Sequence, residues 1–200
     1  MTEAHQLADQ RVRLRLIGAP SSTVVANVLL SQAGWFACVT GAAHGWGWLG
    51  PAVATAVVAW HVARAAEPRL EAALIGLIAF VGASFETVMV RSGWVRFDAG
   101  VMPFEGVAPV WMVALWALFA TNLNVSLRTL HGRWQLAALL GAIGGPLAYL
   151  SGARLGALQW VDAGAALAAI AIGWATLMPL LLLAARRLDG YRDHQIAKRK

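Results

Sequence analysis

Residues 161–185 read VDAGAALAAIAIGWATLMPLLLLAA, and Asp162 is the one charged side chain in this run. A hydrocarbon core about 30 Å thick is crossed by about 20 mostly apolar residues in a helix. An isolated strand would leave its backbone polar groups without partners in lipid, so a run of this kind must be helical. The stretch therefore predicts a transmembrane helix.

Five further runs upstream have the same character. The six predicted spans are residues 23–43, 48–66, 70–90, 109–127, 136–155 and 161–185. Hydrophobic residues make up 59% of the chain and charged residues 13%, whereas a soluble domain carries about 25% charged residues. So few charges exclude a soluble or disordered chain. The predicted fold is an all-α polytopic membrane protein with six transmembrane helices in a single bundle.

The cations predict the orientation of this bundle. With the N-terminus in the cytoplasm, 13 of the 16 Lys and Arg residues fall on the cytoplasmic side and three, Arg91, Arg96 and Arg154, on the other. Such a bias favours an N-in, C-in topology. The sequence thus divides into a basic cytoplasmic N-terminal segment (1–22), a six-helix transmembrane domain (23–185) and a basic cytoplasmic tail (186–200).

The net charge of +6 has two readings. Because the cations lie between apolar runs, they indicate membrane lipids as partners and not nucleic acid. Cys38 is the single cysteine, which excludes disulfide scaffolds and zinc modules. No metal-ligand spacing, nucleophile elbow or phosphate loop occurs, so neither a metal site nor a cofactor is expected.

Glu86 is the clearest candidate for a ligand-binding or proton-titrating group, because ionisable residues inside a bilayer are costly. The alternative is an interfacial ion pair with Arg91 or Arg154. Arg154 itself either binds an anionic group or extends its long side chain to the headgroups.

A second group of polar residues is predicted near the cytoplasmic side. Asn27, His61, Asn124 and Arg128 come from spans that reach the same half of the bilayer. They form either an inner polar cluster that binds a ligand or a set of interhelical hydrogen bonds.

The fifth span has a pattern of small residues. Gly141, Gly145, Gly152 and Gly156 share a helix face, which predicts close packing of another helix. Pro146 predicts a kink near the middle of the span. A kinked, glycine-rich helix can also open a midplane ligand site, as in transporters.

Several strings resemble a bacterial inner-membrane family named only as domain of unknown function 2878. They are Asn27 with QAGWFACV (32–39), PVW (109–111), LWALFA (115–120), LNVSL (123–127) and GAIGGPLAYLSGARLGA (141–157). The resemblance implies a multi-pass protein of the bacterial inner membrane without an established activity. It also implies lipid-modifying enzymes as candidate partners.

Together these features predict a lipid-envelope accessory protein, or one that binds a lipid or small apolar ligand, rather than an enzyme. A homo-oligomer is a further possible assembly. The alternatives are a small transporter with a midplane site at Pro146 and a lipid-modifying membrane enzyme that uses Glu86 or His61.

Overall fold

The computed structural model describes residues 22–97 and 105–191 of the 200-residue chain. These residues form the α-helices α2 (Ser22–Ala43), α3 (Leu49–Ala63), α4 (Pro68–Arg91), α5 (Val110–Leu123), α6 (Trp134–Arg154) and α7 (Ala163–Arg187). They also form a 3-10 helix, η1 (Arg128–Leu130), and the strands β1 (Val95–Arg96) and β2 (Gln159–Trp160). Each predicted apolar run overlaps one α-helix, so the all-helical prediction is confirmed.

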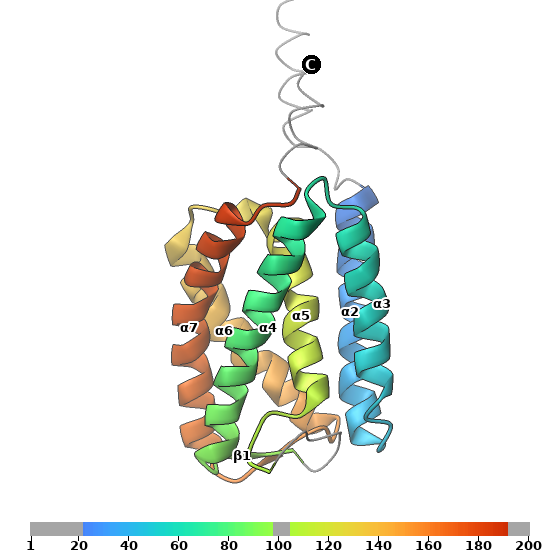
Figure 1. The fold of residues 1–200 in the computed structure, drawn as a ribbon. Coiled ribbons are helices and arrows are strands. Elements are labelled where there is room, and N and C mark those ends of the chain that lie inside the picture. Colours follow the sequence, from blue (N-terminus) through green and yellow to red (C-terminus); the bar gives the residue numbers. More distant parts are fainter. Residues whose placement is uncertain (1–21, 98–104, 192–200) are drawn as a thin grey trace, which may run out of the picture.

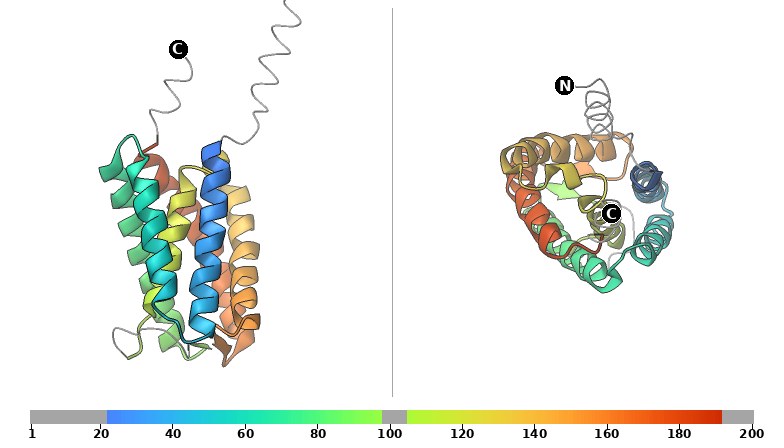
Figure 2. Two further views of the ribbon diagram at one scale, coloured as in Figure 1. Left: turned by 90° about the vertical axis from the view of Figure 1, so that its right-hand side faces the viewer. Right: turned by 90° about the horizontal axis from the view of Figure 1, so that it is seen from above.

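Successive helices run in opposite directions between the two ends of one bundle (Figure 1). We call these the upper and lower ends, as drawn in Figure 1. Seen from above, α5 lies inside a ring formed by the other five helices (Figure 2). It packs against α2, α3, α4 and α7, and no residue of α5 is exposed. The interior of the bundle is therefore built around α5.

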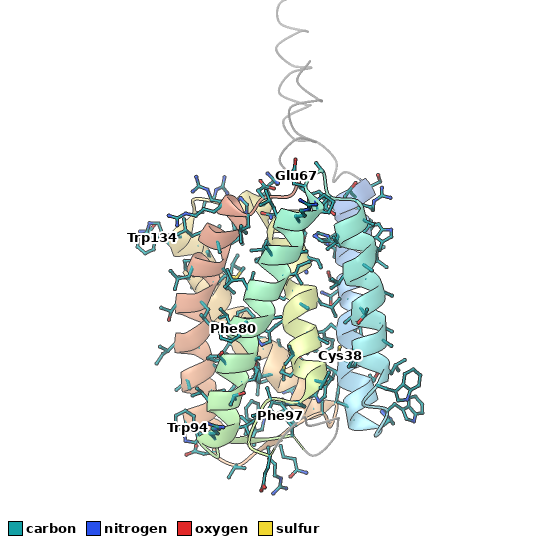
Figure 3. All side chains as sticks on the ribbon, in the orientation of Figure 1. Cys38, Glu67, Phe80, Trp94, Phe97 and Trp134 are labelled. Atoms are coloured by element: carbon teal, nitrogen blue, oxygen red, sulfur yellow. The ribbon has the colours of Figure 1, made fainter. Side chains whose placement is uncertain are left out.

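The sides of the bundle are apolar. Phe80 is 71% exposed, Ile172 69% and Leu29 64%, and Figure 3 shows Phe80 among the side chains on α4. Four helices, α2, α4, α6 and α7, are long and apolar enough to cross a membrane. The other two, α3 and α5, have 15 and 14 residues. Exposed apolar side chains of this kind are compatible with a lipid environment and would be unfavourable in water.

The helix α5 ends earlier than the sequence predicted. The fourth span was expected to continue to residue 127, but α5 stops at Leu123 and the chain turns over 124–127. Asn122 donates from its amide to the Leu118 carbonyl oxygen, and Arg128 donates from Nε to the Asn124 carbonyl oxygen. Polar side chains that bond to nearby backbone groups compete with continued helix, which accounts for the early end.

The lower end is closed by the segment after α4. β1 pairs antiparallel with β2, with Val95 opposite Trp160. Phe97 is buried and packs edge-on against Trp111, with ring centroids 5.6 Å apart. Residues 91–108 connect two predicted spans, and the described part of this segment packs against the lower end of the bundle. Residues 98–104 lie outside the described part of the chain, as do 1–21 and 192–200.

The small-residue face of α6 divides into two parts. A Cβ added at Gly141 or Gly145 would overlap Trp174, so this half of α6 packs closely on α7 as predicted. A Cβ at Gly152 would meet only Leu158, at 3.7 Å, and Gly156 lies beyond the helix end with φ +88°. At Gly156 an added Cβ would meet Ala43, the last residue of α2, also at 3.7 Å, so the packing role of these two glycines stays a prediction.

Candidate functional site

Glu86 lies in the lower half of α4, and its side chain is fully buried. Trp116 of α5 donates its indole N–H to Glu86 Oε1 at 2.9 Å. Tyr149 of α6 donates its hydroxyl to the same oxygen. Gly82 lies one turn earlier on α4, and a Cβ there would overlap the Trp116 ring. A glycine at this position therefore lets the indole lie against α4 and reach the carboxyl group.

The predicted ion pair of Glu86 with Arg91 or Arg154 was wrong. Arg91 donates from Nε to the Gly106 carbonyl oxygen at 3.1 Å, and Arg154 is exposed at the end of α6. The burial of Glu86 against α5 and α6 keeps its carboxyl group away from both cations. Its second oxygen, Oε2, is buried and has no hydrogen-bond partner among the described residues.

A cavity of about 190 Å³ lies beside Glu86. Its walls come from α2, α5 and α6, with single residues from α4 and α7. Six aromatic residues line it: Trp35, Trp111, Trp116, Phe119, Tyr149 and Trp174. The aliphatic residues Val39, Met112, Leu115, Leu118 and Leu158 complete most of the remaining wall. Gln32 of α2 and Ala148 of α6 also line the cavity and are exposed, so it reaches the side of the bundle between these two helices.

Two of the aromatic rings that line the cavity stack on each other. Trp116 and Trp174 are stacked, with centroids 4.8 Å apart and an interplanar angle of 19°. Phe119 packs edge-on against Trp174 at 5.1 Å. The indole N–H of Trp174 is buried and has no partner in the described part of the chain. The cavity is thus lined by a residue with an unpaired acceptor, Glu86, and a residue with an unpaired donor, Trp174.

Pro146 does not line the cavity. The helix α6 continues through Pro146, and its contribution to the cavity comes from Ala148, Tyr149 and Gly152. The place where Gly152 leaves space beside α6 is therefore also the place where the cavity lies.

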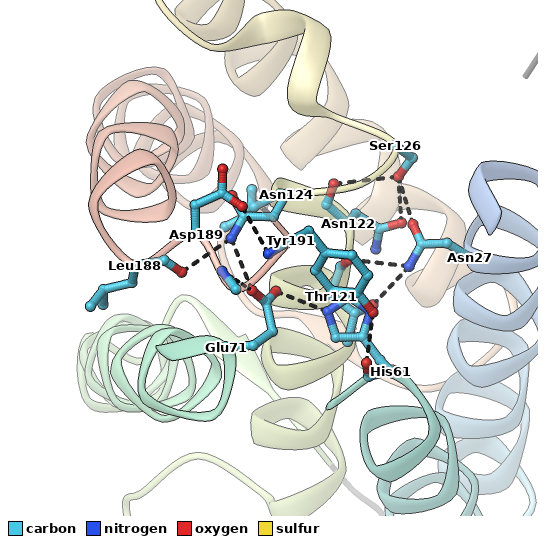
Figure 4. A network of polar contacts seen from close by, with 12 residues as sticks. Asn27, His61, Glu71, Thr121, Asn122, Asn124, Ser126, Leu188, Asp189 and Tyr191 are labelled. Atoms are coloured by element: carbon cyan, nitrogen blue, oxygen red, sulfur yellow. Dashed lines mark hydrogen bonds and ion pairs between the residues drawn. The ribbon is translucent and has the colours of Figure 1, made fainter. Parts of the chain in front are cut away.

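A second buried carboxylate, Glu71, lies at the upper end of the same helix (Figure 4). Glu71 Oε1 lies 2.9 Å from His61 Nε2 of α3, as an ion pair when the imidazole is protonated. Glu71 Oε2 accepts from the Asn124 amide and from the Gly190 backbone N–H, both at 3.1 Å. Both oxygens are therefore satisfied by the protein itself.

The chain after α7 takes part in this upper network. Asp189 accepts from Arg128 at 2.6 Å, and Tyr191 donates its hydroxyl to the His61 carbonyl oxygen at 2.6 Å. Burial, followed by the charge of Glu71, raises the pKa of Tyr191 to about 12. The sequence assigned residues 186–191 to the tail, but Asp189, Gly190 and Tyr191 are buried against the bundle.

Asn27 belongs to a neighbouring but different group of hydrogen bonds. Its amide donates to the Thr121 carbonyl oxygen at 3.1 Å, and its Oδ1 accepts from Ser126 at 2.9 Å. Ser31 donates to Asn122 Oδ1 at 3.1 Å, which ties α2 to α5 a second time. The structure therefore links His61 and Asn124 through Glu71, and Arg128 to the Asn124 carbonyl oxygen, whereas Asn27 joins α2 to the end of α5.

Sequence reasoning missed several residues of both sites. Tyr149 and Tyr191 are the two tyrosines of the chain, and each contacts one of the two sites. A tyrosine in an apolar span needs an acceptor for its hydroxyl, and this was the available signal for Tyr149. Glu71 lies near the start of the predicted span 70–90 and is not among the predicted site residues.

The described residues contain no group of three or more His, Cys, Asp or Glu side chains that could hold a metal ion. A search of curated proteins and a search of solved structures found no match to this chain.

A family profile, in contrast, matches residues 24–180. The chain belongs to the family described as "Protein of unknown function (DUF2878)". The match covers the helices α2 to α6 and most of α7, and so includes every residue that lines the cavity.

Proposed function

We propose that this protein binds a lipid or another small apolar molecule in the cavity between α2, α5 and α6. The cavity itself supports the proposal: it is lined mostly by aromatic and aliphatic side chains and reaches the side of the bundle at Gln32 and Ala148. Small-molecule sites are concave, mostly apolar and furnished with a few polar groups, which here are Glu86 and the residues at the rim.

The size of the cavity fits this role. An apolar cavity of about 150 Å³ holds a benzene-sized molecule in a protein interior. A cavity of about 190 Å³ therefore accommodates a ring or a small headgroup, with a longer chain leaving between α2 and α6.

We further propose that all six helices cross the inner membrane of a bacterium, with the upper end in the cytoplasm. The arginines of the described residues support this orientation. Six lie at the upper end, Arg64, Arg69, Arg128, Arg133, Arg186 and Arg187, and three at the lower end, Arg91, Arg96 and Arg154. An excess of cations marks the cytoplasmic side.

The short helices α3 and α5 are compatible with six crossings. The 15 residues of α3 rise about 22 Å, less than a hydrocarbon core of about 30 Å. Trp46 and Trp48 are exposed just before α3, where indole rings favour the headgroup level and extend the crossing. Because α5 is enclosed by protein, its turn at 124–127 does not face lipid.

Photocrosslinking tests the binding proposal. The purified protein is reconstituted in nanodiscs with a phospholipid that carries a diazirine on one acyl chain, and labelled peptides are mapped by mass spectrometry. We expect labelling of 111–119 and 148–152 that excess unlabelled phospholipid displaces. Displaceable labelling at these peptides separates a site from ordinary contact with bulk lipid.

Two neighbouring substitutions on α6 make the test specific. Ala148→Trp places a large ring at the mouth of the cavity and should abolish the displaceable labelling. Leu147→Trp is the matched control, because Leu147 is 56% exposed but does not line the cavity. Labelling spread evenly over the outer faces, with no displaceable fraction at either peptide, would contradict the proposal.

A further inference from the structure

Glu86 has no positively charged partner among the described residues. Its carboxyl group is fully buried, and its two partners, the Trp116 indole and the Tyr149 hydroxyl, are neutral donors. The ion pairs found within residues 22–97 and 105–191 join His61 to Glu71 and Arg128 to Asp189, and neither involves Glu86. A buried carboxylate without a charge partner is unfavourable, so a cation that enters the cavity gains from the interaction.

Glu86 is the acidic residue that such a cation would meet in the cavity. Glu86 Oε1 accepts both hydrogen bonds, while Oε2 is buried, unpartnered and part of a residue that lines the cavity. Oε2 has less than 1 Å² of accessible surface, so a cation in the cavity lies beside the carboxyl group and is attracted by its charge without touching this atom directly.

The remaining walls suit a positively charged organic group. Six aromatic side chains line a cavity of about 190 Å³, and cations bind favourably over aromatic faces, most strongly over Trp when water is excluded. Quaternary ammonium groups are recognised in this way by cages of aromatic rings. A fatty acid or a phosphate group would instead place a second negative charge beside Glu86.

We propose that the ligand of this cavity is an amphiphilic amine or quaternary ammonium compound whose cationic group lies against Glu86 and the surrounding aromatic rings. The apolar part of the ligand leaves the cavity between Gln32 and Ala148. This inference rests on the proposed function and adds the chemical class of the ligand.

Three probes of equal chain length test the inference in nanodiscs. Decyltrimethylammonium, decanol and decanoate carry a positive, a neutral and a negative headgroup, and each competes with the photoreactive phospholipid for the cavity peptides. We expect decyltrimethylammonium to displace the label at about tenfold lower concentration than decanol, with decanoate the weakest. Wild-type protein that responds equally to the cation and the alcohol would overturn the inference and leave the proposed function standing.

The variant Glu86→Gln assigns the preference to this carboxyl group. Glutamine keeps the size of the side chain and an acceptor oxygen for Trp116 and Tyr149, so comparing the cation with decanol in the same variant isolates the effect of the charge. The preference for the cation should shrink to about threefold or less, since the charge is gone. A Glu86→Gln protein that keeps the full preference would also overturn the inference.

A second variant keeps the test decisive should Glu86→Gln fail to accumulate. Trp35→Leu removes one aromatic wall without contact to Glu86 and should lower the preference for the cation by a few fold. Phe80→Leu is the control, because Phe80 is 71% exposed and does not line the cavity. If none of the three probes displaces any label, both the proposed function and this inference are contradicted. Equal displacement by the cation and the alcohol contradicts this inference alone.

Discussion

Glu71 and Glu86 are both fully buried on α4, yet their surroundings differ at every point that matters for function. Around Glu71, three side-chain or backbone groups satisfy both carboxylate oxygens, and His61 supplies a countercharge when it is protonated. Around Glu86, one oxygen accepts both hydrogen bonds, and the other is buried without a partner among the described residues, in a side chain that lines a cavity.

This difference separates a structural role from a binding role. A polar group whose hydrogen bonds are all made within the protein has none left for a ligand, and removing it destabilises the fold. A polar group left unsatisfied beside empty volume costs stability, and a ligand can recover that cost. The network around Glu71 joins α3, α4, the end of α5 and the chain after α7, so we assign it to holding the upper end together.

The largest expected difference in stability is between two glutamine variants, Glu71→Gln and Glu86→Gln. Glu71→Gln replaces one of the two acceptor oxygens with an NH2 group, and it removes the charge that faces His61. We expect a loss of about 3–5 kcal/mol in the free energy of unfolding, the range for breaking a buried pair. Glu86→Gln keeps an acceptor for both donors and should cost about 1 kcal/mol or less.

The measurement is thermal unfolding of both variants in the same mild detergent, with the wild type alongside. Equal losses at the two positions would remove the distinction between a structural and a binding carboxylate on α4.

A smaller effect is expected from glycine substitutions on the same helix. Gly82→Ala drives a Cβ into the Trp116 ring and should cost about 1–3 kcal/mol, as overpacking does. It also moves the indole away from Glu86, so displaceable labelling of the cavity should weaken. Gly76→Ala is the control, since nothing lies within 4 Å of the added Cβ and alanine favours helix by up to about 1 kcal/mol.

Melting temperatures and the photocrosslinking signal of the two glycine variants decide this prediction. A Gly82→Ala protein as stable as Gly76→Ala would mean that Trp116 shifts freely, and the position of the indole against Glu86 would then not depend on this glycine.

The smallest expected effect is a pH dependence at the upper end. Burial lowers the pKa of His131, more than the Leu123 carbonyl oxygen and Asp189 raise it, and Arg128 and Arg186 lower it further. The unfolded chain therefore binds a proton more readily than the folded protein. The contribution of His131 to stability is fully present above its ordinary pKa of 6.5 and is lost as the pH falls toward the folded pKa.

Melting curves at about pH 7.5 and about pH 5.5 test this linkage, with His131→Gln as the reference. Glutamine can still donate to the Leu123 carbonyl oxygen, which accepts from His131 Nε2 at 2.9 Å, but it does not titrate. The wild type should lose more stability on acidification than the variant. The cavity lies outside this effect, so displacement of the lipid label should not differ between the two proteins.

The helices could be predicted from the sequence because their apolar runs are long and nearly free of charge. The exception is the end of α5, where Asn122 and Arg128 donate to nearby backbone carbonyl oxygens and the helix ends at Leu123. The predicted polar cluster was right in part, since His61, Asn124 and Arg128 do meet at the upper end. Asn27 was placed near them but bonds to Thr121 and Ser126.

The site around Glu86 was beyond the reach of sequence reasoning. Glu86 stood out as a carboxyl group in a span. Its partners, Trp116 of α5 and Tyr149 of α6, are 30 and 63 residues away along the chain. The face of α6 that carries Gly152 resembles a packing surface in sequence, and only the positions of α2 and α5 leave a cavity there.

The sequence by itself determined the class of this protein, its helices and its membership in a family, because apolar length and charge distribution act locally along the chain. The tertiary structure alone decided which carboxylate is satisfied and which is open. Whether a carboxylate oxygen has a hydrogen-bond partner depends on which side chains of other helices reach it. For Glu86, Gly82 leaves space for the Trp116 indole to lie against α4 and donate to Oε1. Hydropathy sums over residues of one segment, whereas a binding site is a property of several segments at once.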